Sequence, residues 1–187
     1  MDFEATLRVV GQKLDASGCR WAVIGGVAMG VYGVLRTTVD IDLLVDGSCA
    51  ARLEPLLTEE GYTLSFRWEE SSHYTPTRGD RCPLDVLHAH RAHSMGMLAR
   101  ARRRPLADGA FSLPVVELED LIGLKVQAMV NDPDRWRGEL VDMRALLEAA
   151  ASRTVKVDME RVREYFALFN EEKQLEELLE GIEDALR

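Results

Sequence analysis

Two aspartates, Asp40 and Asp42, stand inside an otherwise apolar run that reads VDIDLLV from Val39 to Val45. Burying a carboxylate without a partner is costly, so a fold rarely does it without a purpose. In a β-strand alternate side chains share a face, which places the two acids together with their Cα atoms about 6.6 Å apart. Two like charges this close repel each other unless a cation lies between them. The spacing therefore predicts a site for a divalent cation.

A third acid, Asp85, lies in a second β-like run, PLDVLHA. Mg²⁺ and Mn²⁺ prefer oxygen ligands, and Mg²⁺ usually shares its coordination shell with water and substrate phosphates. Three carboxylates are enough to hold two such ions, which activate an attacking oxygen and stabilise a leaving one. We therefore expect Asp40, Asp42 and Asp85 to bind Mg²⁺ or Mn²⁺ for phosphate chemistry. The alternative is that the acids are exposed strand residues paired with Arg36 and other bases, which the apolar flanks disfavour.

A glycine pair, Gly25-Gly26, separates the apolar run WAVI from the helix-like segment VAMGVYGVL. Without side chains, glycines let a phosphate approach backbone N–H groups at the positive end of a helix. A tight turn would explain the pair equally well on its own. Neither GxxxxGK[ST] nor GxGxxG occurs in the chain, so a P-loop and a dinucleotide fold are not indicated. The combination of the glycine pair with the two acids is what favours a phosphate site.

The predicted elements around these residues indicate a mixed α/β half followed by a helical half. Strands are expected at 21–24, 39–45, 62–68 and around residue 85, with helices at 3–14 and 49–61. The polar stretch Glu69 to Arg81 is expected to be a loop, and LPVVEL an edge strand or a lead-in to a helix. Helices are expected at 118–130, 135–151, 159–169 and 173–186. The fold class is therefore α+β: a mixed sheet flanked by helices in residues 1–115, followed by a C-terminal helical bundle, 116–187, that packs on it.

The overall composition is that of an ordinary globular protein, with 187 residues of which 47% are hydrophobic and 29% charged. No apolar run approaches the roughly 20 residues that cross a bilayer, and the first residues do not resemble a signal peptide. We therefore expect a cytoplasmic protein with no membrane partner. The three cysteines, Cys19, Cys49 and Cys82, are odd in number and lack CxxC spacing, which favours buried free thiols over a disulfide framework. Cys82 with the three histidines at 88, 90 and 93 does not match common zinc spacings.

The net charge of −9 is unevenly distributed along the chain. Residues 158–187 contain 10 acids and 4 bases, a net charge of −6, whereas no acid lies between Asp85 and Asp108. The five arginines of the stretch from Arg91 to Arg104 form a local basic patch that could contact RNA. The acidic C-terminal segment has a narrow apolar stripe between its glutamates. The charged residues are expected to form a solvated face, and the alternative is that the stripe serves a partner helix. The residues of this stripe are Leu175, Leu178, Leu179, Ile182 and Leu186.

The pattern from Ile24-Gly25-Gly26 through Asp40-Ile41-Asp42, with 13 residues between, resembles the signature of the nucleotidyltransferase superfamily with the polymerase β-like fold. Arg36 and Thr37-Thr38 before the acids also resemble the minimal nucleotidyltransferases and the AbiEii-type toxins. The resemblance covers residues 20–46 and weakens after them. It implies that Asp85 is the third acid on a neighbouring strand.

The same resemblance implies roles in nucleotide binding. Gly25 and Gly26 would seat the triphosphate, and Arg36 and Thr37 would lie against the nucleotide. The segment LEDLIGLKVQAM resembles the helix in which a lysine contacts the nucleotide, which implies that role for Lys125, with a surface lysine as the alternative.

The next helical segment departs from the family pattern. In Gly138-Glu139-Leu140-Val141-Asp142 the basic residue is missing and a glutamate stands in place of an aspartate. Whether Glu139 and Asp142 take part is left open.

The function that follows is the metal-dependent transfer of a nucleoside monophosphate from an NTP to a hydroxyl of RNA, such as tRNA, or of a protein, including a role in a toxin–antitoxin system. The alternative is a catalytically weak module that acts as an antitoxin or binds a cognate toxin, antitoxin or other partner protein. The intact set of three acids favours the enzyme, because a binding module does not need them.

Overall fold

The computed structural model describes residues 1–77, 79–180 and 182 and divides into two compact units. The sheet unit comprises Met1–Val31 and Arg36–Val116, and the helical unit comprises Tyr32–Leu35 and Glu117–Arg187. The regions expected from the sequence, 1–115 and 116–187, differ from these units at residues 32–35 and 116.

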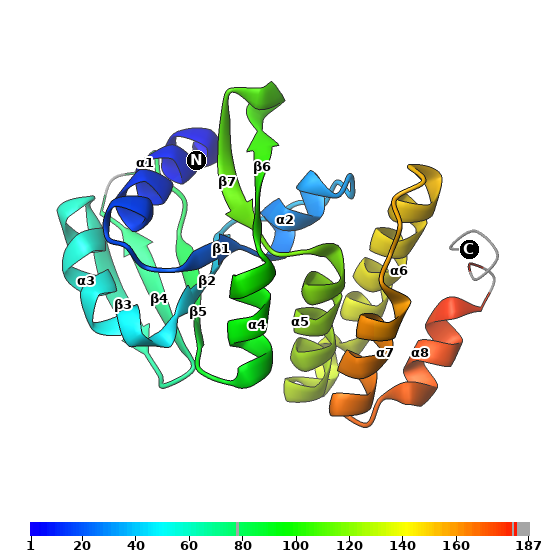
Figure 1. The fold of residues 1–187 in the computed structure, drawn as a ribbon. Coiled ribbons are helices and arrows are strands. Elements are labelled where there is room, and N and C mark those ends of the chain that lie inside the picture. The colour runs from blue at the N-terminus through cyan, green and yellow to red at the C-terminus, as the bar shows by residue number, and fades with distance from the viewer. Residues whose placement is uncertain (78, 181, 183–187) are drawn as a thin grey trace. The chain divides into compact units, whose positions relative to one another are not determined.

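The sheet unit is built on one mixed sheet of seven strands in the order β3-β4-β5-β2-β1-β7-β6 (Figure 1). The central strand β2 runs antiparallel to β1 and parallel to β5. Its residues Ile41, Leu43 and Val45 are buried, so an alternating apolar face anchors the strand in the core. The strands are β1 (Trp21–Val23), β2 (Ile41–Asp46), β3 (Tyr62–Arg67), β4 (Ser71–Pro76), β5 (Leu84–Ala89), β6 (Arg102–Leu106) and β7 (Phe111–Val115).

Four α-helices belong to the sheet unit: α1 (Phe3–Ala16), α2 (Gly25–Val31), α3 (Ala50–Glu59) and α4 (Ala92–Arg100). Helix α1 begins after Asp2, whose carboxylate accepts a hydrogen bond from the backbone N–H of Ala5 at 2.9 Å and so caps the helix. At Gly11, α1 lies so close to β1 and β7 that a Cβ atom would come within 2.7 Å of Leu113 and 3.2 Å of Trp21. This glycine therefore allows the helix to pack directly on the sheet. Short 3₁₀ turns, η1 (Gly47–Cys49) and η2 (Ala107–Gly109), follow β2 and β6.

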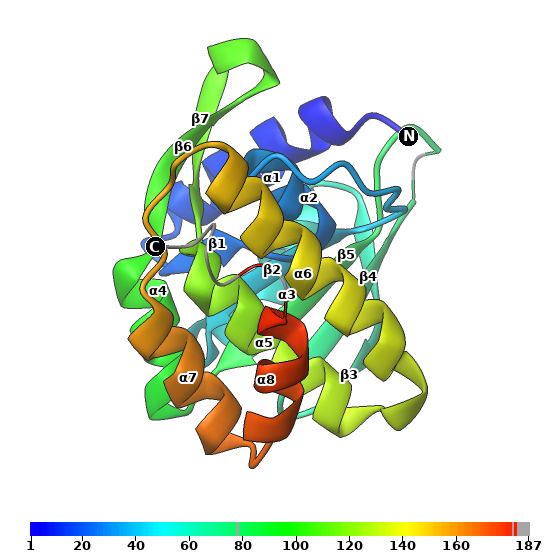
Figure 2. The same cartoon turned by 90° about the vertical axis from the view of Figure 1, so that its right-hand side faces the viewer.

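The helical unit contains α5 (Leu118–Asn131), the short turn η3 (Pro133–Arg135), α6 (Trp136–Ser152), α7 (Met159–Leu168) and α8 (Glu172–Leu179). Helix α5 contacts α6 and α7, and α8 contacts the same two helices, so the four form a bundle (Figure 2). On α5, Gly123 leaves room for the ring of Tyr165 from α7, whose hydroxyl donates a 2.7 Å hydrogen bond to the buried Asp120. The apolar stripe of the acidic segment is buried at Leu175, Leu178, Leu179 and Ile182, and Leu186 lies outside the described residues.

The α+β class, with a mixed sheet flanked by helices and followed by a helical bundle, is confirmed. The expected loop from Glu69 to Arg81 is wrong, because Ser71–Pro76 forms strand β4 between β3 and β5. The polar composition of this segment obscures the alternation of burial that is typical of a strand. Ser72 and Tyr74 are buried, whereas His73 between them is more exposed. The expectation of an edge strand at LPVVEL is also wrong, because β7 lies between β1 and β6, and β6 is the edge.

Among the described residues, no helix combines the length and the apolar character that crossing a bilayer requires.

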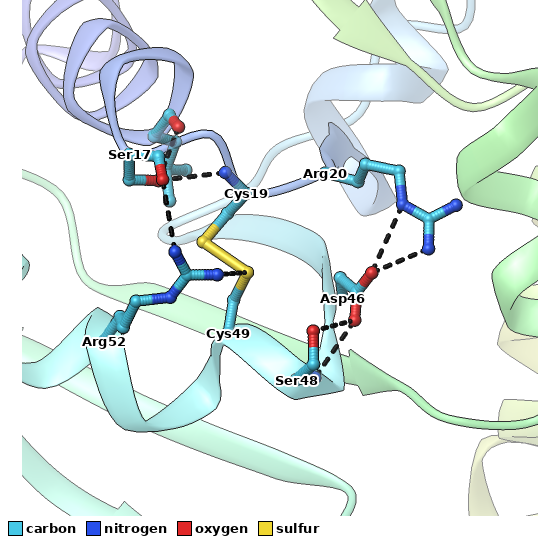
Figure 3. Close-up of a disulfide and its surroundings, with 8 residues drawn as sticks. Ser17, Cys19, Arg20, Asp46, Ser48, Cys49 and Arg52 are labelled. Atoms are coloured by element: carbon cyan, nitrogen blue, oxygen red, sulfur yellow. Dashed lines mark hydrogen bonds and ion pairs between the residues drawn. A yellow bond between two sulfur atoms is a disulfide. The ribbon is translucent and has the colours of Figure 1, made fainter.

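A disulfide joins Cys19, just before β1, to Cys49 in the turn after β2 (Figure 3). The expectation of free thiols is therefore wrong for these two residues and holds for Cys82, which is buried. The spacing of the cysteines does not predict this disulfide, because they are 30 residues apart and are brought together only by the pairing of β1 with β2. The guanidinium of Arg52 donates to Cys49 Sγ at 3.0 Å, so the bridge packs against α3.

We expect the disulfide to stabilise the sheet unit by about 3 to 4 kcal/mol, because it closes a loop in the unfolded chain. Urea unfolding of the Cys19→Ser/Cys49→Ser variant, compared with the unreduced protein, measures this difference. As a control, thiol titration of the urea-unfolded, unreduced protein should find one thiol, Cys82. Three titratable thiols would contradict the bridge.

Candidate functional site

Asp42 and Asp85 lie opposite each other on neighbouring parallel strands. Asp42 is the second residue of β2 and Asp85 the second of β5, and the two are register partners. Neighbouring strands are about 4.8 Å apart and register partners share a face, so both carboxylates project from one face of the sheet. Both residues are half-buried. Asp85, the expected third acid, thus lies beside Asp42 as predicted.

The Asp42 carboxylate lies directly against the backbone of Gly25. A Cβ atom on Gly25 would come within 1.8 Å of Asp42 Oδ2, and Gly25 has a φ of +59°, which side chains rarely adopt. The backbone N–H of Ile24 also donates to the carbonyl of Asp42 at 3.0 Å. Gly25 and Gly26 are the first residues of α2 rather than a turn before it, so the start of this helix meets an acid-bearing strand.

Gly26 is packed in the same way against the segment that carries Asp40. A Cβ atom there would come within 2.9 Å of the Thr38 side chain, and the Thr38 hydroxyl donates to Asp40 Oδ1 at 2.9 Å. Asp40 precedes β2, which begins at Ile41 and not at the expected Val39. The glycine pair therefore contacts both acids, Asp42 directly and Asp40 through Thr38.

His73 on β4 is a site residue that sequence reasoning missed. It is the register partner of Asp85, and its Nδ1 forms a short hydrogen bond with Asp85 Oδ1. Its ring stacks on Phe66 of β3, with centroids 5.5 Å apart and planes at 9°. Asp42, Asp85, His73 and Phe66 thus form one cross-strand row over β2, β5, β4 and β3. The only available signal was the alternation in SSHYTP, which polar residues obscured.

Arg36 and Thr37 lie in the segment between α2 and β2 and are exposed. They belong to the sheet unit, as do the glycines and the three acids. Their proximity along the chain to Thr38 and Asp40 is compatible with the predicted role at the nucleotide.

The carboxylates suit Mg²⁺ or Mn²⁺ chemically, as an oxygen donor pair on one sheet face. Within the described parts of the chain, no three His, Cys, Asp or Glu side chains are arranged to hold a metal ion together. Mg²⁺ is commonly held by one or two carboxylates, with substrate phosphates and water completing its shell. Asp42 and Asp85 fit this manner of binding, and the participation of Asp40 stays a prediction.

His88 and His90 contact the turn between β3 and β4. His88 is buried, donates from Nδ1 to the carbonyl of Glu69 at 3.0 Å and faces the Ser72 hydroxyl with Nε2. Burial lowers the pKa of His88 and so favours its neutral form. His90 also contacts the carbonyl of Glu69, at 3.0 Å. These two imidazoles therefore connect β5 to the turn between β3 and β4.

Lys125 lies inside the helical unit, where its ammonium group contacts two carboxylates. It is 2.9 Å from Glu139 and 2.6 Å from Asp142, and its side chain is almost fully buried. Arg135 contacts the second oxygen of Glu139 at 2.8 Å. The segment that departs from the family pattern thus supplies the partners of this lysine, and the alternative of a surface lysine is wrong. Contact of Lys125 with a nucleotide stays a prediction.

The arginines of the stretch from 91 to 104 lie at the ends of α4 and along β6. Arg91 pairs with Glu70 at 3.1 Å, and Arg103 pairs with Asp15 at 3.0 Å. Charged residues on an edge strand also oppose pairing with the edge of another molecule. Arg102 and Arg103 on the edge strand β6 fit this protective role.

Comparison with known proteins identifies the fold. No protein-family profile and no curated protein sequence matches the chain. The antibiotic-resistance factor ANT(2'')-Ia is similar in structure, with 20% identity and a TM-score of 0.63 over 95% of this chain and 97% of the other. A second structure of that factor, in complex with adenylyl-2''-tobramycin, has 20% identity and a TM-score of 0.62 over 90% and 97%.

Two further structures share the architecture. An antigenic nucleotidyltransferase-like protein from Paracoccidioides brasiliensis has 16% identity and a TM-score of 0.56 over 95% of this chain and 92% of the other. The lincosamide antibiotic adenylyltransferase LnuA, bound to lincomycin, has 15% identity and a TM-score of 0.54 over 76% and 95%. The chain therefore has the nucleotidyltransferase fold, as its glycine and acid pattern predicted.

We expect Gly25→Ala to destabilise the protein by more than the backbone strain of about 1 to 2 kcal/mol, because its Cβ atom would overlap the Asp42 carboxylate. Gly18→Ala is the matched control, since Gly18 has a φ of +69° with nothing within 4 Å of an added Cβ atom. Urea unfolding measures both. Combining Gly25→Ala with Asp42→Gly should reduce the cost to that of Gly18→Ala. Equal costs for the two single variants would contradict the close approach.

We expect Lys125→Met to destabilise the protein by about 3 to 5 kcal/mol, because Glu139 and Asp142 would lose the buried ammonium group that both carboxylates contact. Lys13→Met is the control: Lys13 is an exposed lysine that contacts Glu60 at 2.9 Å, and an exposed ion pair contributes far less to stability than a buried one. Adding Glu139→Gln and Asp142→Asn to Lys125→Met should restore part of the lost stability. A loss no larger than that of Lys13→Met would contradict the buried triad.

Proposed function

We propose that the protein is a metal-dependent nucleotidyltransferase, which moves a nucleoside monophosphate from an NTP to a hydroxyl acceptor. The observation that carries the proposal is the packing of the Gly25 backbone on the carboxylate of Asp42, which is the register partner of Asp85. A fold that needs only a stable sheet has no reason to place two acids opposite each other and to strip the adjoining helix start of side chains. A triphosphate bound through a cation needs both features.

In this proposal Asp42 and Asp85, joined by Asp40, hold Mg²⁺ or Mn²⁺. The bound cation would neutralise phosphate charge and make the α-phosphorus a better electrophile. Gly25 and Gly26 offer backbone N–H groups to the triphosphate, with Arg36 and Thr37 beside them. The nucleotide-binding role of Lys125 stays a prediction from the resemblance, and in this structure its ammonium group contacts Glu139 and Asp142.

The reaction follows from these positions. The acceptor hydroxyl attacks the α-phosphorus, its oxygen forms the new O–P bond, and the bond from the α-phosphorus to the bridging oxygen breaks. Pyrophosphate carries away the electron pair, and the hydroxyl proton passes to Asp85. Alignment and charge neutralisation supply most of the acceleration in such transfers.

The acceptor that the observations favour is a hydroxyl of a small molecule. The similar structures of ANT(2'')-Ia and LnuA contain adenylyl-2''-tobramycin and lincomycin, and the former is matched over almost the whole of both chains. The pairing of Arg91 with Glu70 and of Arg103 with Asp15 reduces the positive charge that RNA would meet. RNA remains the second candidate because Arg91, Arg102 and Arg103 are exposed.

A protein-binding role is less well supported. The apolar stripe that would serve a partner helix is buried inside the helical unit at Leu175, Leu178 and Leu179. A cognate toxin or antitoxin, the AbiEii-type resemblance and AMP addition to a protein hydroxyl stay predictions of the sequence, as does a cytoplasmic location.

We expect α-phosphate-labelled NTP and Mg²⁺ to give label transfer with the wild-type chain, and Asp42→Asn and Asp85→Asn to lower the rate about 100-fold or more. The label should be sought separately in RNA, protein and small-molecule fractions of a cell extract, which distinguishes the acceptors. Asp80→Asn, an exposed carboxylate of the same unit, should transfer label at the wild-type rate. Transfer that survives both site substitutions, or its absence from the wild-type chain in all fractions, would contradict the proposal.

A further inference from the structure

His73 contacts a site carboxylate directly, since its Nδ1 is hydrogen-bonded to Asp85 Oδ1. A carboxylate that is ionised can only accept hydrogen bonds, so the proton between His73 Nδ1 and Asp85 Oδ1 comes from the imidazole. His73 therefore engages one oxygen of Asp85 and fixes the orientation of its carboxylate plane.

The ring of His73 is itself held in place. It lies nearly parallel to the ring of Phe66, with centroids 5.5 Å apart. A stacked pair of this kind restricts rotation of the imidazole, which would otherwise be free to turn its nitrogens away from Asp85.

An irregularity in the sheet creates this stack. The β3–β4 ladder pairs Leu64 with Tyr74 and then shifts, so that Phe66 and not Ser65 lies opposite His73. A bulge of this type redirects a side chain, and bulges are common beside active sites. Ser65 instead lies 2.6 Å from Thr75 through the two hydroxyl oxygens. The additional residue in β3 thus puts an aromatic ring where a regular ladder would put a serine.

We propose that His73 is a positioning residue for Asp85, clamped by Phe66, which orients the carboxylate toward the acceptor hydroxyl. The inference rests on the proposed nucleotidyl transfer. The contact of His73 with one oxygen leaves the other oxygen of Asp85 to receive the proton of the acceptor or to bind the cation. The row from Asp42 through Asp85 and His73 to Phe66 then extends the site across four strands.

The contact can be tested without turnover. Long-range ¹H–¹⁵N spectra of the full-length, metal-free protein should show neutral His73 as the Nδ1–H tautomer, and Asp85→Ala should remove this preference. Finding the Nε2–H tautomer in the wild-type chain would overturn the proposal, whether or not the protein transfers nucleotides.

The role is tested by three substitutions of the same residue. His73→Phe keeps the ring stack but lacks the donor, and we expect kcat to fall about 10- to 100-fold with little change in KM for the NTP. His73→Asn places an amide N–H where Nδ1 was and should restore most of kcat, whereas His73→Ala should resemble His73→Phe. Thr75→Val, two residues further along β4, is the control and should leave both constants unchanged.

The outcomes separate the two proposals. Wild-type kcat in His73→Phe, or an equal loss in His73→Asn and His73→Phe, would overturn the positioning role while label transfer stands. Absence of transfer in the wild-type chain, with the Nδ1–H tautomer present, would overturn the proposed function and the role together, and the contact itself would remain.

Discussion

The close approach of the Gly25 backbone to the Asp42 carboxylate is the constraint on which the rest of the site depends. A side chain at position 25 would occupy the space of Asp42 Oδ2, so the helix start can meet the strand only because its first residue is glycine. The position of Asp42 is fixed by backbone hydrogen bonds, because β2 lies between β1 and β5 in the sheet. Asp42, in the middle of the sheet, thus lies beside the first residue of a helix. A carboxylate attracts cations and the N–H groups at a helix start attract anions, so the two together favour a cation bound with an anion.

In both units, acidic side chains contact a hydrogen-bonding or charged partner. In the sheet unit, the row of two acids ends on the imidazole of His73, which donates to the second acid. In the helical unit, the buried ammonium of Lys125 is shared between Glu139 and Asp142, and Arg135 compensates the surplus negative charge. Burying such groups is tolerated because each has a charged or hydrogen-bonding partner.

Much of the fold and part of the site could be predicted, because the signals are local. Apolar alternation revealed the strands that carry Asp42 and Asp85, and glycines without side chains marked the start of α2. His73 could not be predicted, because polar residues hid its strand and only a bulge in β3 brings Phe66 against it. The disulfide was missed for a related reason: Cys19 and Cys49 meet through strand pairing, which spacing does not report. The similar solved structures, at 15 to 20% identity, establish the fold and leave the chemistry to be argued from these contacts.

The parallel pairing of β2 with β5 also determines when the site can exist during synthesis. Parallel neighbours need a long crossover, and here the intervening chain contains α3, β3 and β4. The two acids therefore cannot meet until the chain has been made as far as β5, and the partner β4 must be in place for His73 to reach Asp85. A nascent chain that ends before Leu84 carries the glycine pair and the first acids but no assembled site. Contacts of this sequence separation form slowly, so the pairing of Asp42 with Asp85 should appear late in folding.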